Sequence, residues 1–196
     1  IVPLFYKENL GPVENIKQVY KKAKGKYIAH MDGDDIALPG KLQKQFDILE
    51  KNPDCSICVH NMNAVDANSN FMKREFTIFD EKKYSLIDMY LINPFFIHSS
   101  KMFINKIDEY IDDLNENALD IEVHIEQAKQ GNIYFLKENL GIYRQFVGVT
   151  YDGKFTLEKV SCFGACDVAP AVKINGTVYG HLDSEEKIRD LLQKFI

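Results

Sequence analysis

The stretch that decides the fold is Met31-Asp32-Gly33-Asp34-Asp35, which follows the short apolar run Tyr27-Ile28-Ala29. The apolar run predicts a strand, and the residues after the acidic stretch predict a helix. Carboxylates this close repel one another unless solvent, a basic side chain or a divalent cation lies among them. Open α/β sheets bind ligands at the carboxyl ends of their strands, so the position favours a binding site. The alternative is an acidic turn that caps the next helix.

The segments around this stretch alternate between strand and helix patterns, which predicts an α/β fold with a mostly parallel sheet and flanking helices. The helix after Pro39 is expected to bury an apolar stripe, namely Leu38, Leu42, Phe46 and Leu49. We expect helices over 11–25, 39–52, 80–91, 106–114 and 119–130, and strands over 1–6, 26–31, 56–65, 71–79, 133–136 and 140–144.

The bulk composition excludes several classes of protein. The chain has 196 residues, enough for one ordinary domain or one domain plus a fragment, and its net charge of −5 argues against a general nucleic-acid binder. No signal peptide is visible, and the most apolar stretch, 89–97, is too short to span a bilayer. A cytoplasmic location is expected, with the inner membrane face as the alternative. Because the chain begins at Ile1 instead of Met, it reads as a fragment or a processed product.

The four cysteines fall into two close pairs, Cys55/Cys58 and Cys162/Cys166. Without a secretory signal, close pairs indicate metal or redox roles before disulfides. Cys55 and Cys58 lie in a predicted strand, where their odd spacing places them on opposite faces. We therefore expect both to be core thiols.

The pattern changes between Gln145 and Asp152, so we place the domains at 1–147 and 148–196. The second part predicts strands at 154–160, 171–174 and 177–180, with the hairpin dipeptide Asn175-Gly176 between the last two. A final helix is expected to begin at Asp183, with Glu186 completing a capping box.

Several motifs occur in an order that resembles family-2 glycosyltransferases with the GT-A fold over 1–147. They are Asn9-Leu10-Gly11, Asn15, the stretch 23–35, Leu38 to Leu42, Leu119 to Glu122, Gly131 to Ile133, and Leu140 to Arg144. The family begins with a strand and helix that hold the nucleotide, and this unit is missing here, so the resemblance implies a truncated and impaired domain.

The resemblance implies an inverting transfer of a hexosyl group from a nucleotide-sugar to a glycan or lipid-linked acceptor, in cell-surface polysaccharide synthesis. Asp32 and Asp34 would hold Mn²⁺ or Mg²⁺ against the diphosphate. Asp120 matches the base that deprotonates the acceptor hydroxyl, with Glu122 as its competitor and a helix-terminal Asp as the structural alternative. Further residues that would bind the nucleotide-sugar are Asp35, Asn15 and Arg144; for Arg144 a surface ion pair is equally open.

The segments 152–158 and 162–170, with the final hairpin and helix, resemble the C-terminal half of the thioredoxin-like [2Fe-2S] ferredoxin domain found in the E-type subunit of NADH-quinone oxidoreductase. The resemblance implies that Cys162 and Cys166 are two of the four thiolates that hold a [2Fe-2S] cluster. The upstream cysteine pair of that family is absent, so the iron-sulfur site is incomplete unless a second chain completes it.

Three hypotheses about function therefore stand side by side. The first is a glycosyltransferase, the second an electron-transfer subunit fragment of an NADH-quinone oxidoreductase or hydrogenase, and the third a chimeric reading frame without activity. The five histidines are interpreted as structural, and His98 is the one exception considered, because the resemblance places it near the acceptor.

Overall fold

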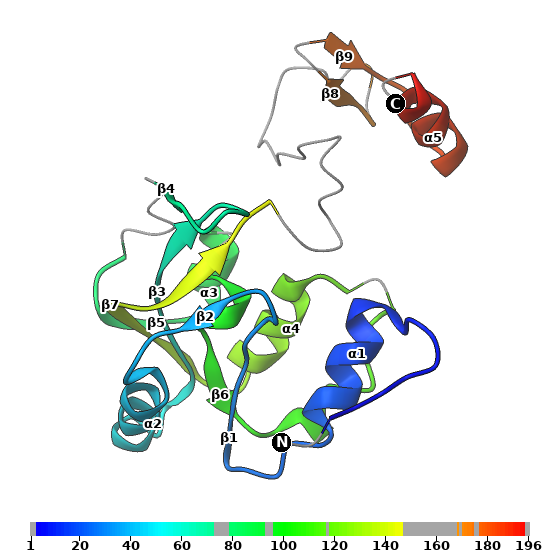
Figure 1. The fold of residues 1–196 in the computed structure, drawn as a ribbon. Coiled ribbons are helices and arrows are strands. Elements are labelled where there is room, and N and C mark those ends of the chain that lie inside the picture. Colours follow the sequence, from blue (N-terminus) through cyan, green and yellow to red (C-terminus); the bar gives the residue numbers. More distant parts are fainter. Residues whose placement is uncertain are drawn as a thin grey trace. The chain divides into compact units, whose positions relative to one another are not determined.

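The structure is a computed structural model that describes residues 3–72, 79–92, 96–116, 118–146, 168, 170–174 and 177–194. The chain divides into two compact units, Ile1–Val147 and Gly148–Ile196, and each is described here by itself (Figure 1). Cys162, Cys166 and the strand predicted at 154–160 lie outside the described residues.

A curled seven-stranded sheet forms the centre of the first unit. The predicted mostly parallel sheet is wrong for the described strands, because β3 and β7 form their one parallel pair and every other pair is antiparallel. The sheet order is β1 (Tyr27–Ala29), β6 (Met102–Ile104), β3 (Cys55–Val65), β7 (Asn132–Arg144) and β2 (Ile36–Ala37), with β4 (Phe71–Met72) paired to β3 and β5 (Lys82–Tyr84) paired to β7.

Helices cover both faces of this sheet (Figure 1). Three of them, α1 (Gly11–Tyr20), α3 (Leu86–Leu91) and α4 (Asp120–Ala128), contribute to one apolar core with Ile57 and Val59 of β3. The helix α2 (Lys41–Lys51) packs Leu49 into a second core with Cys58. Successive strand residues point to opposite faces, so β3 feeds both cores and the flanking helices of the prediction are confirmed.

Several predicted boundaries shift because short strands and turns replace helix. Residues 3–6 form no strand, and α1 ends at Tyr20 instead of residue 25. The helix predicted over 80–91 is β5 followed by α3, which Ser85 and Asp88 cap reciprocally. The segment 106–114 holds only the short 3₁₀ turn Ile107–Glu109, and one strand, β7, spans both strands predicted at 133–144.

The buried face of α2 differs from the predicted apolar stripe. Leu49 is buried as expected, but the side chains of Leu42 and Phe46 are 58% and 43% exposed, respectively. Lys41 and Gln45 are buried in their place. A buried polar side chain is tolerated when its hydrogen bonds are made, and the Gln45 amide nitrogen donates to two backbone carbonyls, those of Cys58 and Ser100. The helix is therefore held to the sheet partly by polar contacts.

Cys55 and Cys58 are free, buried thiols of the second apolar core. The prediction of core thiols is confirmed, whereas their placement on opposite faces is wrong. The pairing of β3 with β7 shifts register between Cys55 and Ile57, and this irregularity breaks the two-residue alternation. Burial raises the pKa of Cys55 to about 11 and that of Cys58 further above its ordinary value, so neither is a ready thiolate.

The second unit contains an antiparallel hairpin followed by a helix, as the sequence predicts. The hairpin consists of β8 (Val172–Ile174) and β9 (Thr177–Tyr179). The helix α5 (Glu185–Gln193) begins two residues later than predicted, because Ser184 precedes it and its hydroxyl accepts the Lys187 backbone N–H. Among the helices of the described ranges, none has the length and apolar character needed to cross a bilayer.

Candidate functional site

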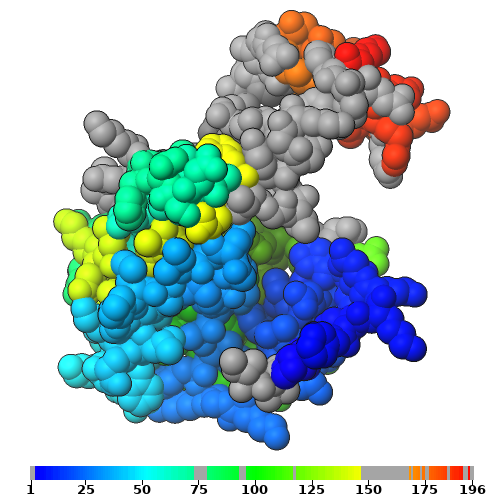
Figure 2. Space-filling view, in the orientation of Figure 1, coloured from blue at the N-terminus to red at the C-terminus, as the bar shows by residue number. Residues whose placement is uncertain are grey.

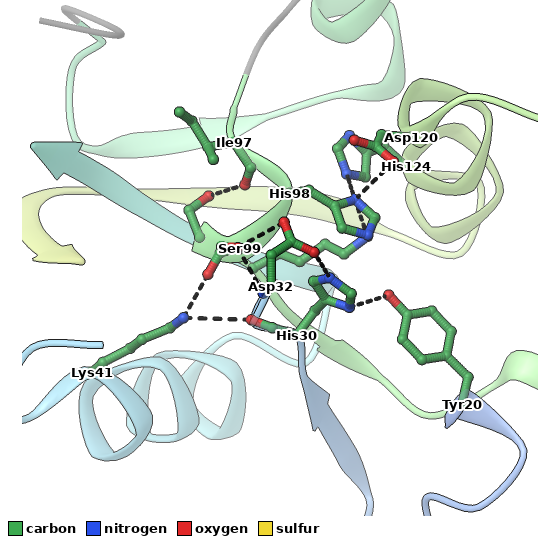
Figure 3. A network of polar contacts seen from close by, with 11 residues as sticks. Tyr20, His30, Asp32, Lys41, Ile97, His98, Ser99, Asp120 and His124 are labelled. Atoms are coloured by element: carbon green, nitrogen blue, oxygen red, sulfur yellow. Dashed lines mark hydrogen bonds and ion pairs between the residues drawn. The ribbon is translucent and has the colours of Figure 1, made fainter. Parts of the chain in front are cut away.

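Asp32 lies in the loop between β1 and β2, and neighbouring side chains hold both of its carboxylate oxygens (Figure 3). One oxygen is 2.9 Å from Nε2 of His30, and the other accepts a 2.9 Å hydrogen bond from the Ser99 hydroxyl, which in turn accepts the Asp32 backbone N–H. Partial burial acts to raise the pKa of Asp32, but the bonds from His30 and Ser99 bring it below its ordinary value. The carboxylate is therefore fixed and ionised.

Lys41 holds together the two backbone segments that carry His30 and Ser99. Its ammonium donates to the backbone carbonyls of Ser99, at 2.5 Å, and His30, at 3.5 Å. The residue is almost fully buried, and burial lowers its pKa to about 8 against the opposing effects of Asp35 and Asp32. The first residue of α2 thus ties the end of β1 to the short 3₁₀ turn His98–Ser100.

Two histidines, His30 and His98, lie next to Asp32, and a third, His124, lies behind His98 (Figure 3). Nδ1 of His30 is 2.9 Å from the Tyr20 hydroxyl, and Nδ1 of His98 is 2.9 Å from Nε2 of His124. The rings of His30 and His98 meet edge to face with centroids 4.0 Å apart. The fully buried Lys101 places Nζ 3.2 Å from Nδ1 of His98. Burial lowers the pKa of His98 far below its ordinary value, so this ring is neutral.

Asp120 begins α4 and lies at the edge of this cluster. Its carboxylate is 3.8 Å from Nδ1 of His98, and 65% of its side chain is exposed. Loss of surrounding water raises the pKa of Asp120, while nearby Lys101 opposes the rise. Glu122, the competing candidate, accepts the Leu119 backbone N–H at 3.1 Å and so caps the helix. The geometry leaves Asp120 as the carboxylate that faces the cluster.

Arg144, at the end of β7, contacts the second half of the acidic loop. Its backbone N–H donates to Asp35 at 2.9 Å, and its guanidinium donates to the Asp34 carbonyl and the Ser69 hydroxyl. The Asp34 side chain is exposed, and Oδ2 of Asp35 is buried without a hydrogen-bond partner among the described residues. Figure 2 shows the light-blue loop region and the yellow end of β7 on the same face.

The structure brings together most residues that the sequence singled out. Asp32 and Asp120 face one polar cluster, and Asp34, Asp35 and Arg144 are joined through the loop. Asn15 is exposed on α1, and no contact in the described ranges joins it to the acidic loop. Sequence reasoning missed the polar side chains that support the loop, and only their position beside apolar runs could have indicated them: the mostly buried His30 and the buried Lys41, Ser99, Lys101 and His124.

The acidic loop fits a divalent cation. Asp32 is ionised, Asp34 is exposed, and a buried oxygen of Asp35 lacks a partner in the described ranges. Carboxylate oxygens are ligands that Mg²⁺ and Mn²⁺ accept. The described cysteines do not fit an iron-sulfur cluster, because Cys55 and Cys58 are buried in an apolar core and their pKa values are raised. The two thiols that the resemblance assigns to the cluster, Cys162 and Cys166, lie outside the described residues, so no electron-transfer step is assigned to this chain.

Comparison with known families assigns the two parts of the chain differently. The model of the family "Glycosyl transferase family 2" matches residues 2–112. The model described as "Thioredoxin-like [2Fe-2S] ferredoxin" matches residues 123–196. Residues 123–147 of the second match belong to the first compact unit, in which β7 pairs with β3. The sequence resemblances to both families are confirmed.

Individual relatives show the same division. An uncharacterized protein of Mycobacterium tuberculosis is 27% identical over 79% of this chain, which spans 44% of that relative. An uncharacterized glycosyltransferase of Methanocaldococcus jannaschii is 34% identical over 48% of the chain and 34% of its own length. An E-type subunit of NADH-quinone oxidoreductase from Rickettsia felis is 46% identical over 24% of the chain and 27% of its own length. The chain thus spans less than half of these relatives.

Proposed function

The chain belongs to glycosyl transferase family 2, and we propose that it transfers a sugar from a nucleotide-sugar to a hydroxyl group of a glycan or lipid-linked acceptor. One observation carries this proposal: an ionised, fixed Asp32 and an exposed Asp120 lie at the same polar cluster, which contains His98 and Lys101. Two carboxylates with different surroundings can take different roles in one reaction.

On the donor side, we propose that Asp32 and Asp34 hold the cation and that Asp35, Arg144 and Asn15 contact the nucleotide-sugar. A bound divalent cation would neutralise charge on the leaving diphosphate. His30 and Ser99 keep Asp32 ionised and hold its two carboxylate oxygens in place. Arg144 fixes the loop through the Asp35 carboxylate and the Asp34 carbonyl, which supports a preformed binding surface.

On the acceptor side, Asp120 is the proposed general base. It takes the proton of the acceptor hydroxyl as that oxygen attacks the anomeric carbon, while the bond from this carbon to the diphosphate oxygen breaks. Attack opposite the leaving group inverts the configuration of the sugar. The raised pKa makes Asp120 a stronger base than an ordinary aspartate, and its exposed carboxylate can reach an incoming hydroxyl.

Calorimetry on the full chain tests this function. Titration with nucleoside diphosphate sugars in the presence of Mn²⁺ is expected to give binding that disappears without the metal and in Asp34→Ala. Asp47→Ala is the matched control, because Asp47 is a half-buried aspartate of α2 outside the acidic loop, and it is expected to bind like the wild type. Absence of metal-dependent binding in the wild type would overturn the proposal.

A further inference from the structure

We propose that His30, Asp32 and His98 form a transition-metal site with two imidazole nitrogens and one carboxylate oxygen as ligands. Each residue offers one ligand atom, and these atoms lie within 4.8 Å of one another. This inference deepens the proposed function, on which it rests for the role of the cation. It differs from a site of carboxylates alone, because two ligands are nitrogen atoms from the end of β1 and from the turn before β6.

His30 and Asp32 are already oriented as metal ligands usually are. Nδ1 of His30 is bonded to the buried Tyr20 hydroxyl, which leaves Nε2 facing Asp32 at 2.9 Å. The second oxygen of Asp32 accepts the Ser99 hydroxyl at 2.9 Å. Metal-bound histidines and carboxylates commonly have such outer partners, which fix the ring and the carboxylate in place. Both ligands therefore have their supporting contacts before any cation binds.

His98 supplies the independent observation. Its ring is 6% exposed, its Nδ1 is 2.9 Å from Nε2 of His124, and its own Nε2 is buried without a hydrogen-bond partner among the described residues. When Nδ1 carries the proton and donates it to His124, Nε2 presents a free lone pair. A buried nitrogen without a partner is costly, and a metal ion would satisfy it. The His30 ring lies beside it, with centroids 4.0 Å apart.

The ligand types indicate which cations bind. Imidazole nitrogen suits Co²⁺ and Zn²⁺, whereas Mg²⁺ prefers oxygen ligands and keeps its waters. Mn²⁺ accepts both kinds of ligand. The site is therefore expected to prefer Co²⁺, Zn²⁺ and Mn²⁺ over Mg²⁺.

Lys101 opposes metal binding, so a substitution at this position tests the proposed ligand geometry at His98. Its Nζ is 3.2 Å from Nδ1 of His98, where an ammonium would donate and hold the wrong tautomer of the ring. Asp32 and Asp120 partly offset its charge. Replacing Lys101 with Met keeps most of the length of the buried side chain and removes the competing donor. Lys101→Met is therefore expected to bind the metal more tightly than the wild type.

Titration of the full chain with Co²⁺ alone, without nucleotide, tests the site by visible absorption of the bound ion. We expect bands in the wild type, and affinity weakened by more than about 100-fold in His98→Gln and His30→Gln, because a lost ligand costs more than the 10–100-fold of a lost outer partner. His60→Gln is the control: His60 is buried with an unpartnered Nε2 but lies in β3. Equal affinity in all variants would overturn the inference.

A measurement on the wild type covers the case in which a histidine variant does not fold. Electron spin-echo spectra of bound Mn²⁺ are expected to show coupling to imidazole nitrogen, and coupling to oxygen ligands only would overturn the site. The two proposals fail separately. If nitrogen coupling is absent but Mn²⁺-dependent nucleotide-sugar binding is lost in Asp34→Ala, this inference is wrong and the proposed function stands. Nitrogen coupling without nucleotide-sugar binding would support the metal site and overturn the proposed function.

Discussion

The rim and the floor of the candidate site are built from different kinds of contact. The rim consists of Asp32, Asp34 and Asp120, whose carboxylates keep access to solvent. The floor is made of fully or almost fully buried polar side chains, namely Lys41, His98, Ser99, Lys101 and His124. Rim carboxylates are open to solvent and can reach a ligand, whereas the floor groups are buried and their hydrogen bonds contribute to stability. Substitutions should therefore separate activity from stability.

The largest effect is expected at Asp120. Asp120→Asn should lower the rate of nucleoside diphosphate release in the presence of acceptor by about 10²–10⁴-fold, the usual contribution of a general base. Its melting temperature should stay unchanged, because 65% of the side chain is exposed. Glu122→Gln should keep the rate and lose some thermal stability, since Glu122 caps α4. The reverse pattern would assign the base to Glu122.

The second effect concerns the cation. Asp32→Asn should weaken Mn²⁺-dependent binding of a nucleoside diphosphate by about 100-fold, because it removes a charged ligand that His30 and Ser99 hold in place. Asp47→Asn is the matched control, since that half-buried aspartate lies in α2, outside the acidic loop, and accepts a local bond from Gln43. Calorimetry distinguishes the two variants. If both bind like the wild type, the rim does not hold the cation.

A floor substitution should act on stability instead. Lys41→Ala leaves the Ser99 and His30 carbonyls without their buried donor and opens a cavity, so we expect a loss of about 2–4 kcal/mol in the free energy of unfolding. Leu42→Ala, at the neighbouring exposed position, should change it by less than about 0.5 kcal/mol. Urea denaturation measures both. Equal losses of unfolding free energy in the two variants would show that the buried hydrogen bonds of Lys41 do not stabilise the fold.

The smallest effect is expected at His60, a buried histidine outside the candidate site. Burial lowers the pKa of His60 from 6.5 to about 4, so below pH 6.5 the unfolded chain binds a proton that the folded chain does not. The stability of the wild type relative to His60→Gln should therefore fall as the pH drops from 6.5 toward 4. The loss should reach about 2 kcal/mol at about pH 5. Denaturation curves at several pH values that stay parallel would show that His60 is not buried neutral.

The local patterns that predicted elements correctly are those that depend on neighbouring residues. Apolar spacing with Gly and Pro at the ends located α1, α2 and α4, and the Asn175-Gly176 dipeptide predicted the hairpin of β8 and β9. The short strands β2 and β5 were not predicted. Each has only two or three residues and forms because β7 is available to pair with it. Together with the antiparallel pairs that β6 forms with β1 and β3, these strands make the sheet mixed instead of mostly parallel.

The sequence by itself indicated the rim: Asp32 and Asp34 soon after a strand, and Asp120 at the start of a helix. Only the tertiary structure decided the floor. Lys41 is buried while Leu42 is exposed. The reason is that Lys41 donates hydrogen bonds to the backbone carbonyls of His30 and Ser99, which belong to other segments of the chain. Burial of a polar group depends on partners that the local sequence does not specify, whereas a solvated carboxylate needs none.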